Sequence, residues 1–366
     1  MLKKIYIHNF RCFENFELEL DQLNLFIGAN GVGKSSLFHV LHQIQSLING
    51  TEKVSSLFSP DDLTLWQKSD VQTFGIEIKG NQGLYEYKLM IKHEETKQRA
   101  RIIQETLLFN GNPLLKFDAG EVQFYHDDNS ASSVYPFDWN QSAVANLPAR
   151  TDNTRITWFR ERLQRFVIVQ IIPMLMKGDS IIEESRLDYN MANYVSWYRL
   201  IYQNQGKAIK ITNALTEVLE GFNYFEFIKT GEMQRILRLS FLNNDREYFY
   251  RFNQLSDGQR MLIALYALIF YARSEDYTLC IDEPQSFVTL AEIQPWLMLM
   301  EKFCDDGELQ TLVISHHPEV IDYLALSCGY RFSRQVHTPT QVKRVKTEDN
   351  SGLPVSELIA SGWFNE

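Results

Sequence analysis

Polar and apolar residues alternate over much of the first third of the chain. Alternation with a period of two, together with β-branched and aromatic residues, predicts strands at 3–20, 23–30, 71–80, 84–93 and 100–111. Residues 34–48 instead carry apolar side chains at helical spacing, which predicts a helix. The polar, turn-rich stretch 118–138 is expected to be a loop with room for one strand.

The apolar period becomes helical after residue 152. In order, the pattern predicts a helix at 153–166, a short strand at 167–172, two helices within 187–220 that break near Gly206, and a strand pair at 235–241 and 247–254. An apolar helix then follows residue 258, before a strand at 277–284, a helix at 291–303 and a strand at 310–317. Such alternation of strands and helices indicates an α/β lobe with a largely parallel sheet.

These patterns suggest one large domain with a smaller insertion. We expect an N-terminal lobe at 1–150 with antiparallel strands, a helical insertion at 151–235 and a C-terminal lobe at 236–366. The helical stretches carry no sustained heptad repeat, which argues against a long coiled coil.

The chain of 366 residues is 45% hydrophobic and 22% charged, with a net charge of −10, so it should be globular and should not bind nucleic acid indiscriminately. Basic residues gather at Lys97, Arg99 and Arg101 and again at 343–346; either group is a solvated strand edge or a DNA contact. Four cysteines without metal-ligand spacing, no signal sequence and no long apolar stretch predict a reduced, cytoplasmic protein outside the membrane.

A glycine-rich turn joins the expected strand 23–30 to the expected helix 34–48. Residues Gly28 to Ser36 satisfy the pattern GxxxxGK[ST] in the strand-turn-helix context that this pattern requires. Small residues let backbone N–H groups face phosphates, Lys34 reaches the β- and γ-phosphates, and Ser35 holds Mg²⁺. The turn therefore predicts a site for ATP and Mg²⁺. Its expected nucleotide contacts are Asn30, Gly31, Gly33, Lys34, Ser35 and Ser36.

A second motif ends the apolar strand at 277–284, where Asp282 and Glu283 precede Pro284. Asp282 can hold the Mg²⁺ shell, and Glu283 is then placed to deprotonate the attacking water. The strand at 310–317 ends in His316 and His317, at the edge where α/β sheets bind ligands. Either histidine can contact the γ-phosphate or act as a structural hydrogen-bonding group, and the sequence leaves that choice open.

The short turn before the apolar helix at 258 contains Ser256, Asp257, Gly258 and Gln259. Ser256 can cap this helix, and the helix start is then a second anion site. Since one nucleotide needs only one phosphate loop, the second site would serve another ATP across a dimer. A plain helix cap is the alternative interpretation.

Together these motifs resemble the ABC-type ATPases of the SMC/RecF group. The segment 28–35 resembles Walker A, 255–259 the signature, 280–284 Walker B, and 286–290 the D-loop. His316 resembles the switch histidine, and Arg11 matches a basic position in the opening strand of the group. The resemblance implies an α/β P-loop NTPase fold, an ABC/RecF-like head with a mostly parallel sheet, an antiparallel β subdomain and a helical insertion. It also requires a Q-loop residue near the metal, for which we choose Gln141, with Gln67 as the alternative.

The resemblance implies two ATP molecules held between two heads. Ser256, Gly258 and Gln259 would then contact the ATP that the other copy binds, with Glu283, His316 and Lys34 as catalytic residues. Differential affinity of ATP for the closed dimer would drive the switch.

We expect an ATPase that works as a homodimer or higher oligomer in anti-phage defence or DNA repair, beside a separate nuclease or toxin subunit and with DNA as an open partner. The ATPase subunit of a membrane transporter is the alternative. A scaffold that binds nucleotide without hydrolysis is a third, which the intact Lys34, Asp282 and Glu283 argue against.

Overall fold

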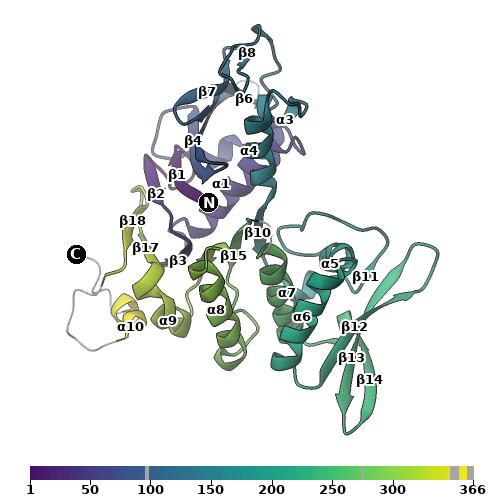
Figure 1. Cartoon of the computed structure of the whole chain (residues 1–366). Coiled ribbons are helices and arrows are strands. Elements are labelled where there is room, and N and C mark those ends of the chain that lie inside the picture. The colour runs from purple at the N-terminus through teal and green to yellow at the C-terminus, as the bar shows by residue number, and fades with distance from the viewer. Residues whose placement is uncertain (95–98, 274–275, 347–353, 361–366) are drawn as a thin grey trace. The chain divides into compact units, whose positions relative to one another are not determined.

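The computed structural model describes residues 1–94, 99–273, 276–346 and 354–360. Lys97 therefore lies outside the described residues. The chain forms two compact units, Met1–Phe166 with Ile321–Glu366 and Val167–Val320 (Figure 1). The expected division at residues 150 and 235 stays a prediction.

Within its described residues, the first unit contains an antiparallel sheet of eight strands in the order β2-β1-β4-β5-β6-β7-β8-β9 (Figure 1). The strands are β1 (Leu2–His8), β2 (Phe16–Glu19), β4 (Val71–Gly80), β5 (Gly83–Glu94), β6 (Arg99–Phe109), β7 (Asn112–Asp118), β8 (Glu121–Phe124) and β9 (Tyr135–Pro136). Every second side chain of β4 is buried up to Ile78, as the alternation predicts. This buried face packs against a helix, because Trp158 and Phe159 stack on Tyr85 at 4.9 and 5.8 Å.

Three further strands of the first unit hold the glycine-rich turn. They are β3 (Leu23–Ile27), β17 (Gly329–Ser333) and β18 (Gln341–Arg344). β3 is fully buried and pairs with β17 in parallel, and β17 pairs with β18 in the antiparallel direction. The helices of this unit are α1 (Lys34–Ile48), α2 (Val54–Leu57), η1 (Pro60–Asp62), α3 (Ala143–Asn146), α4 (Thr154–Gln164) and α10 (Val355–Ala360), and α9 (Pro318–Cys328) contains the unit boundary.

The second unit contains adjacent strands in the order β10-β15-β16. They are β10 (Phe166–Gln170), β15 (Thr278–Asp282) and β16 (Gln310–Ile314). β15 and β16 are parallel and every residue of both is buried, which is typical of a sheet covered on both faces. The accompanying helices are η2 (Pro173–Leu175), η3 (Phe252–Gln254), α7 (Asp257–Ala272) and α8 (Leu290–Asp305).

The rest of the second unit is a four-stranded antiparallel sheet with two helices. Its elements are β11 (Asp179–Ser180), β12 (Phe222–Lys229), β13 (Arg235–Asn243), β14 (Arg246–Arg251), α5 (Tyr194–Tyr202) and α6 (Gln205–Val218). α5 packs on this sheet through the buried ring of Tyr198, whose centroid lies 4.9 Å from that of Phe225. All four cysteines of the chain are free and buried, in accord with the expectation of reduced thiols.

The structure adds strands that the pattern did not predict, namely β7, β11, β12, β17 and β18. β7 follows a two-residue turn in which Asn110 and Gly111 both have positive φ (49° and 78°), and such a turn favours a hairpin. β12 directly follows the segment 187–220 with its helical pattern, and its own strand pattern was not recognised. The expected break between the two helices falls at Asn204, whose side chain accepts a hydrogen bond from the backbone of Lys207 at 3.1 Å and so starts α6 ahead of Gly206.

A buried carboxylate joins the antiparallel sheet to α3. Glu105 accepts hydrogen bonds from the Tyr87 hydroxyl (2.8 Å), the Ser142 hydroxyl (2.5 Å) and the backbone N–H of Ala143 (2.8 Å). Burial raises the pKa of the Glu105 carboxyl above its usual value. Replacing Glu105 with Ala leaves three buried donors without an acceptor, so we expect a loss of about 3 kcal/mol or more of unfolding free energy. Thermal denaturation measures this loss, and Glu121→Ala, on an exposed position of β8, is the control.

Candidate functional site

The glycine-rich turn is a helix start without a side-chain cap. α1 begins after Gly33, which has φ of 107° and no capping hydrogen bond from a side chain. Gly28 and Gly31 also have positive φ, at 141° and 79°. Backbone N–H groups at such a helix start are suited to bind an anion.

Two of these glycines are required because other residues pack against them. A Cβ on Gly33 would lie 2.7 Å from Sγ of Cys12, and one on Gly28 would overlap the carbonyl oxygen of Phe332. The hydroxyl of Thr340 donates to the carbonyl of Val32 at 2.8 Å. The turn is thus held on two sides by distant parts of the same unit.

Lys34 is almost fully buried within the turn, with 6% of its surface exposed. Its ammonium donates to the carbonyls of Gly28 (2.6 Å) and Ala29 (2.9 Å). The positive charge therefore lies inside the loop whose N–H groups start α1. This combination suits a polyphosphate, and Asn30, Ser35 and Ser36 belong to the same turn and helix start.

Arg11 is brought to the helix start from the end of β1. Its Nε lies 2.8 Å from Oδ1 of Asp62, and its Nη1 donates to Oγ of Ser36 at 3.5 Å. A cavity of about 470 Å³ is lined by Arg11, Ser36, Gly31, Trp66 and other residues of this unit. The resemblance singled out Arg11 in the sequence, and the structure places its guanidinium beside Ser36 at the start of α1.

The acidic motif forms a strained turn at the end of β15. Asp282 is 4% exposed. Glu283 has a positive φ of 56°, and its N–H donates to the carbonyl of Ile314 at 3.0 Å. Positive φ is uncommon for a residue with a side chain and costs about 1 kcal/mol or more, so the surrounding structure must hold it.

The structure separates the roles of the two histidines. Nε2 of His316 lies 3.0 Å from Oε1 of Glu283, and the amide of Gln285 donates to the other carboxylate oxygen. His317 instead lies 3.8 Å from Glu319 and donates its N–H to the hydroxyl of Ser315. Only the first histidine contacts the acidic motif within the described residues, so the geometry favours His316 over His317.

The signature turn forms a complete capping box. Oγ of Ser256 accepts from the N–H of Gln259 (3.2 Å), and Oε1 of Gln259 accepts from the N–H of Ser256 (3.0 Å). Asp257 pairs with Arg260 at 2.6 Å, and Arg260 also donates to the carbonyl of Pro173. The negative charge of Asp257 is therefore neutralised by a cation of the same helix.

Gly258 contacts the D-loop segment of the same unit. A Cβ at this position would lie 2.8 Å from the carbonyl oxygen of Phe287, which itself has a positive φ of 70°. Nothing in the sequence pattern signalled this contact. It explains why glycine is needed at 258 independently of any ligand.

The two glutamines chosen from the sequence lie in different places. Gln141 donates to Asp138 at 3.4 Å, in the segment before α3. A Cβ at Gly50, beyond the end of α1, would lie 3.4 Å from Ala145 of α3. α1 has 15 residues and spans about 22 Å, so its far end is distant from the glycine-rich turn. Gln67, by contrast, follows Trp66, which lines the cavity at that turn.

A third glutamine was missed. Gln170 is the last residue of β10, the strand beside β15, and its N–H donates to the carbonyl of Tyr189 at 2.8 Å. Burial and the negative charge of Asp282 raise the pKa of Tyr189 to about 12. The signal was available in the sequence, since a lone glutamine ends an apolar strand shortly before Pro173.

Comparisons with known proteins agree with this geometry. Residues 1–124 match the family model of the AAA ATPase domain. Among solved structures, an SMC head domain from Pyrococcus furiosus, with an extended coiled coil and bound to the C-terminal domain of ScpA, aligns over 100% of this chain and 99% of its own. The identity is 10% and the TM-score 0.54.

The chain has the fold of an SMC head domain. This head fold confirms the expected class, an α/β P-loop NTPase head of the ABC/RecF type. An SMC head domain from Thermotoga maritima is 15% identical over 94% of this chain and 99% of its own, with a TM-score of 0.46. No curated protein matches the chain. In the part of the head that the structure describes, no helix is long and apolar enough to cross a membrane.

Proposed function

We propose that this chain binds ATP with Mg²⁺ and hydrolyses it, and that two copies close around two ATP molecules. The observation that carries the proposal is the turn after β15, where Glu283 is held at 3.0 Å from His316 directly after the buried Asp282. A carboxylate held between a histidine and the side-chain amide of Gln285, rather than solvated, is suited to general base chemistry.

The glycine-rich turn fits the polyphosphate of ATP. Its uncapped helix start and the buried ammonium of Lys34 suit the β- and γ-phosphates. Ser35 and Asp282 would hold Mg²⁺, which neutralises charge that develops on the transferred phosphoryl group. Glu283 then accepts the proton of the attacking water, and His316 fixes the orientation of that carboxylate.

The signature turn of one copy would contact the γ-phosphate bound by the other. The start of α7 offers N–H groups near Ser256 and Gly258, and the pairing of Asp257 with Arg260 removes a negative charge that would repel phosphate. The sandwich dimer rests on the resemblance to the SMC/RecF group and on this neutralised helix start.

The biological role that we propose is regulatory or motor action beside a separate effector in anti-phage defence or DNA repair. The Pyrococcus furiosus head, which is bound to a domain of another protein, supports a partner-protein role for this fold. A DNA contact and a cytoplasmic location remain part of this proposal.

ATP hydrolysis by the purified chain tests the core of the proposal. We expect Mg²⁺-dependent phosphate release that Lys34→Ala abolishes, with ATP affinity at least about 10-fold weaker because the buried ammonium is lost. Lys343→Ala, on an exposed position of β18, is the matched control. Phosphate release that Lys34→Ala leaves unchanged would exclude this site as the source of the activity.

We further propose Gln170, in place of Gln141, as the Q-loop residue. Gln170 ends the strand next to the one that carries Asp282, whereas Gln141 lies in the segment before α3. Gln170→Ala should lower the hydrolysis rate about 10-fold or more, because the water and ion would lose a positioning group. Gln141→Ala and Gln67→Ala measured in the same assay are the comparison. If Gln141→Ala or Gln67→Ala lowers the hydrolysis rate more than Gln170→Ala does, that glutamine is the Q-loop residue instead.

A further inference from the structure

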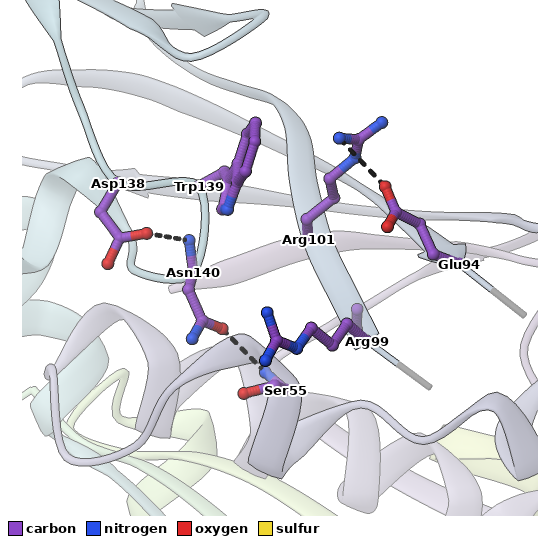
Figure 2. Close-up of a pocket in the computed structure, with 8 residues that line it drawn as sticks. Ser55, Glu94, Arg99, Arg101, Asp138, Trp139 and Asn140 are labelled. Atoms are coloured by element: carbon purple, nitrogen blue, oxygen red, sulfur yellow. Dashed lines mark hydrogen bonds and ion pairs between the residues drawn. The ribbon is translucent and has the colours of Figure 1, made fainter. Parts of the chain in front are cut away.

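A second cavity lies in the first unit, beside Glu94 at the end of β5 and Arg99 at the start of β6 (Figure 2). It has a volume of about 390 Å³, which is within the range of small-molecule sites, about 300–1,000 Å³. It shares no lining residue with the cavity at the glycine-rich turn, as far as the described residues show. Its polar and aromatic lining is formed by Ser55, Glu94, Arg99, Arg101, Trp139 and Asn140.

The acidic groups of this cavity are already paired. Glu94 forms an ion pair with Nη1 of Arg101 at 3.1 Å. Asp138 accepts a hydrogen bond from the backbone of Asn140 at 3.0 Å and so belongs to a turn. Figure 2 shows the guanidinium of Arg99 reaching toward Ser55 and Asn140, on the side away from the Glu94 pair. The cavity therefore presents Arg99 as a cation suited to an anionic ligand.

A second feature of the cavity is the indole ring of Trp139, which lies beside Arg101. The backbone carbonyl of Trp139 accepts from the N–H of Ile102 at 2.8 Å. Cζ of Arg101 lies 5.2 Å from the centroid of the indole ring, yet 51% of Trp139 remains exposed. A fixed and exposed indole is a stacking surface for a planar ligand.

The amide of Asn140 is oriented as well. Its Oδ1 accepts from the N–H of Ser55 at 3.1 Å, and its backbone carbonyl accepts from the N–H of Val54 at the same distance. Because Oδ1 of Asn140 is hydrogen-bonded to α2, the two N–H groups of this amide are the donors that point away from α2. The cavity thus combines a cation, a stacking ring and oriented hydrogen-bond donors.

We propose that this cavity binds one nucleotide unit, with its base on Trp139 and its phosphate on Arg99. The ligand is a nucleoside monophosphate group, which a free nucleotide or a nucleotide within a single strand of nucleic acid can supply. This site is separate from the proposed ATP site and goes beyond the proposed hydrolysis. It also gives a specific role to Arg99 and Arg101, for which the sequence allowed two interpretations, a solvated strand edge or a DNA contact.

Binding measured in a Lys34→Ala background separates this site from the ATP site. The two probes are AMP, by calorimetry, and a short fluorescent oligothymidylate, by anisotropy. We expect Arg99→Ala and Trp139→Ala each to weaken binding about 10-fold, and Trp139→Phe to retain most of it because a stacking ring remains. Arg150→Ala, at an exposed arginine of the same unit, should leave binding unchanged.

The two probes also distinguish the sources of the ligand. If AMP binds and displaces the oligonucleotide, the site takes free nucleotides; if only the oligonucleotide binds, with the same dependence on Arg99 and Trp139, it takes a nucleic acid strand. Either result supports a nucleotide site. The proposal is overturned if neither probe binds, or if both variants bind as the parent does while their thermal melting is unchanged. If the parent chain, with Lys34 intact, does not hydrolyse ATP while AMP binding persists, only the proposed function is contradicted.

Discussion

Replacing Glu283 with Gln will lower ATP hydrolysis by about 10²–10⁴-fold and will trap the chain as an ATP-bound dimer. The change keeps the shape of the side chain but removes the base that accepts a proton from water. His316 lies 3.0 Å from Oε1 and Gln285 donates to Oε2, so both partners of the carboxylate remain in place to hold the amide. ATP binding should be preserved, because we expect it to depend on the glycine-rich turn at residues 28–36, which the substitution does not change.

Phosphate release gives the rate, and light scattering with and without ATP gives the oligomeric state. Glu319→Gln is a matched control, because Glu319 is an exposed acid beside His317 in the same unit. A variant that stays monomeric in ATP and hydrolyses at the parental rate would remove Glu283 from the role of base and would weaken the sandwich dimer.

The second large effect is recovery of activity when two inactive variants are mixed. Ser256→Arg should abolish hydrolysis, because a long cation replaces the cap at the start of α7, while ATP binding to the glycine-rich turn remains. Lys34→Ala should be inactive for the opposite reason, since it loses the ammonium inside that turn.

A mixed dimer of these variants contains one site in which both halves are intact. If the copies exchange freely, half of the dimers are mixed and each has one good site of two, so about a quarter of parental activity should return. Phosphate release measured against the mixing ratio should pass through a maximum near equal amounts. If phosphate release stays at zero at every mixing ratio, the two copies do not form shared sites that work independently.

The motifs that we propose to bind phosphate were predictable because their chemistry is local. Gly28 to Ser36 needed only a strand before it and a helix after it, and the structure has both. Asp282 and Glu283 end a strand that the apolar run marks clearly, and the capping box of Ser256 and Gln259 depends on residues three positions apart. The alternating strands of the first unit follow from the period of two for the same reason.

What the sequence missed depends on contacts between distant segments. The sequence shows Gln170 at the end of an apolar strand, but only the fold shows that this strand lies beside β15. The contact of Gly258 with the carbonyl of Phe287 is likewise visible only in the fold. The resemblance had already selected His316, and the distance to Glu283 gives the geometric reason for this choice over His317. Asp257 pairs with Arg260 one helical turn away, and a search of the sequence for i,i+3 pairs would have found this partner.

The glycine-rich turn near the start of the chain is completed by residues near its end. Gly28 packs on the carbonyl of Phe332, Val32 accepts from Thr340, and β3 pairs with β17. During synthesis, the turn leaves the ribosome some 300 positions before these supports do. A nascent chain that has not yet reached Phe332 and Thr340 therefore carries the glycine-rich sequence without the contacts that shape the turn. We expect such a chain to lack the anion site that the folded turn offers.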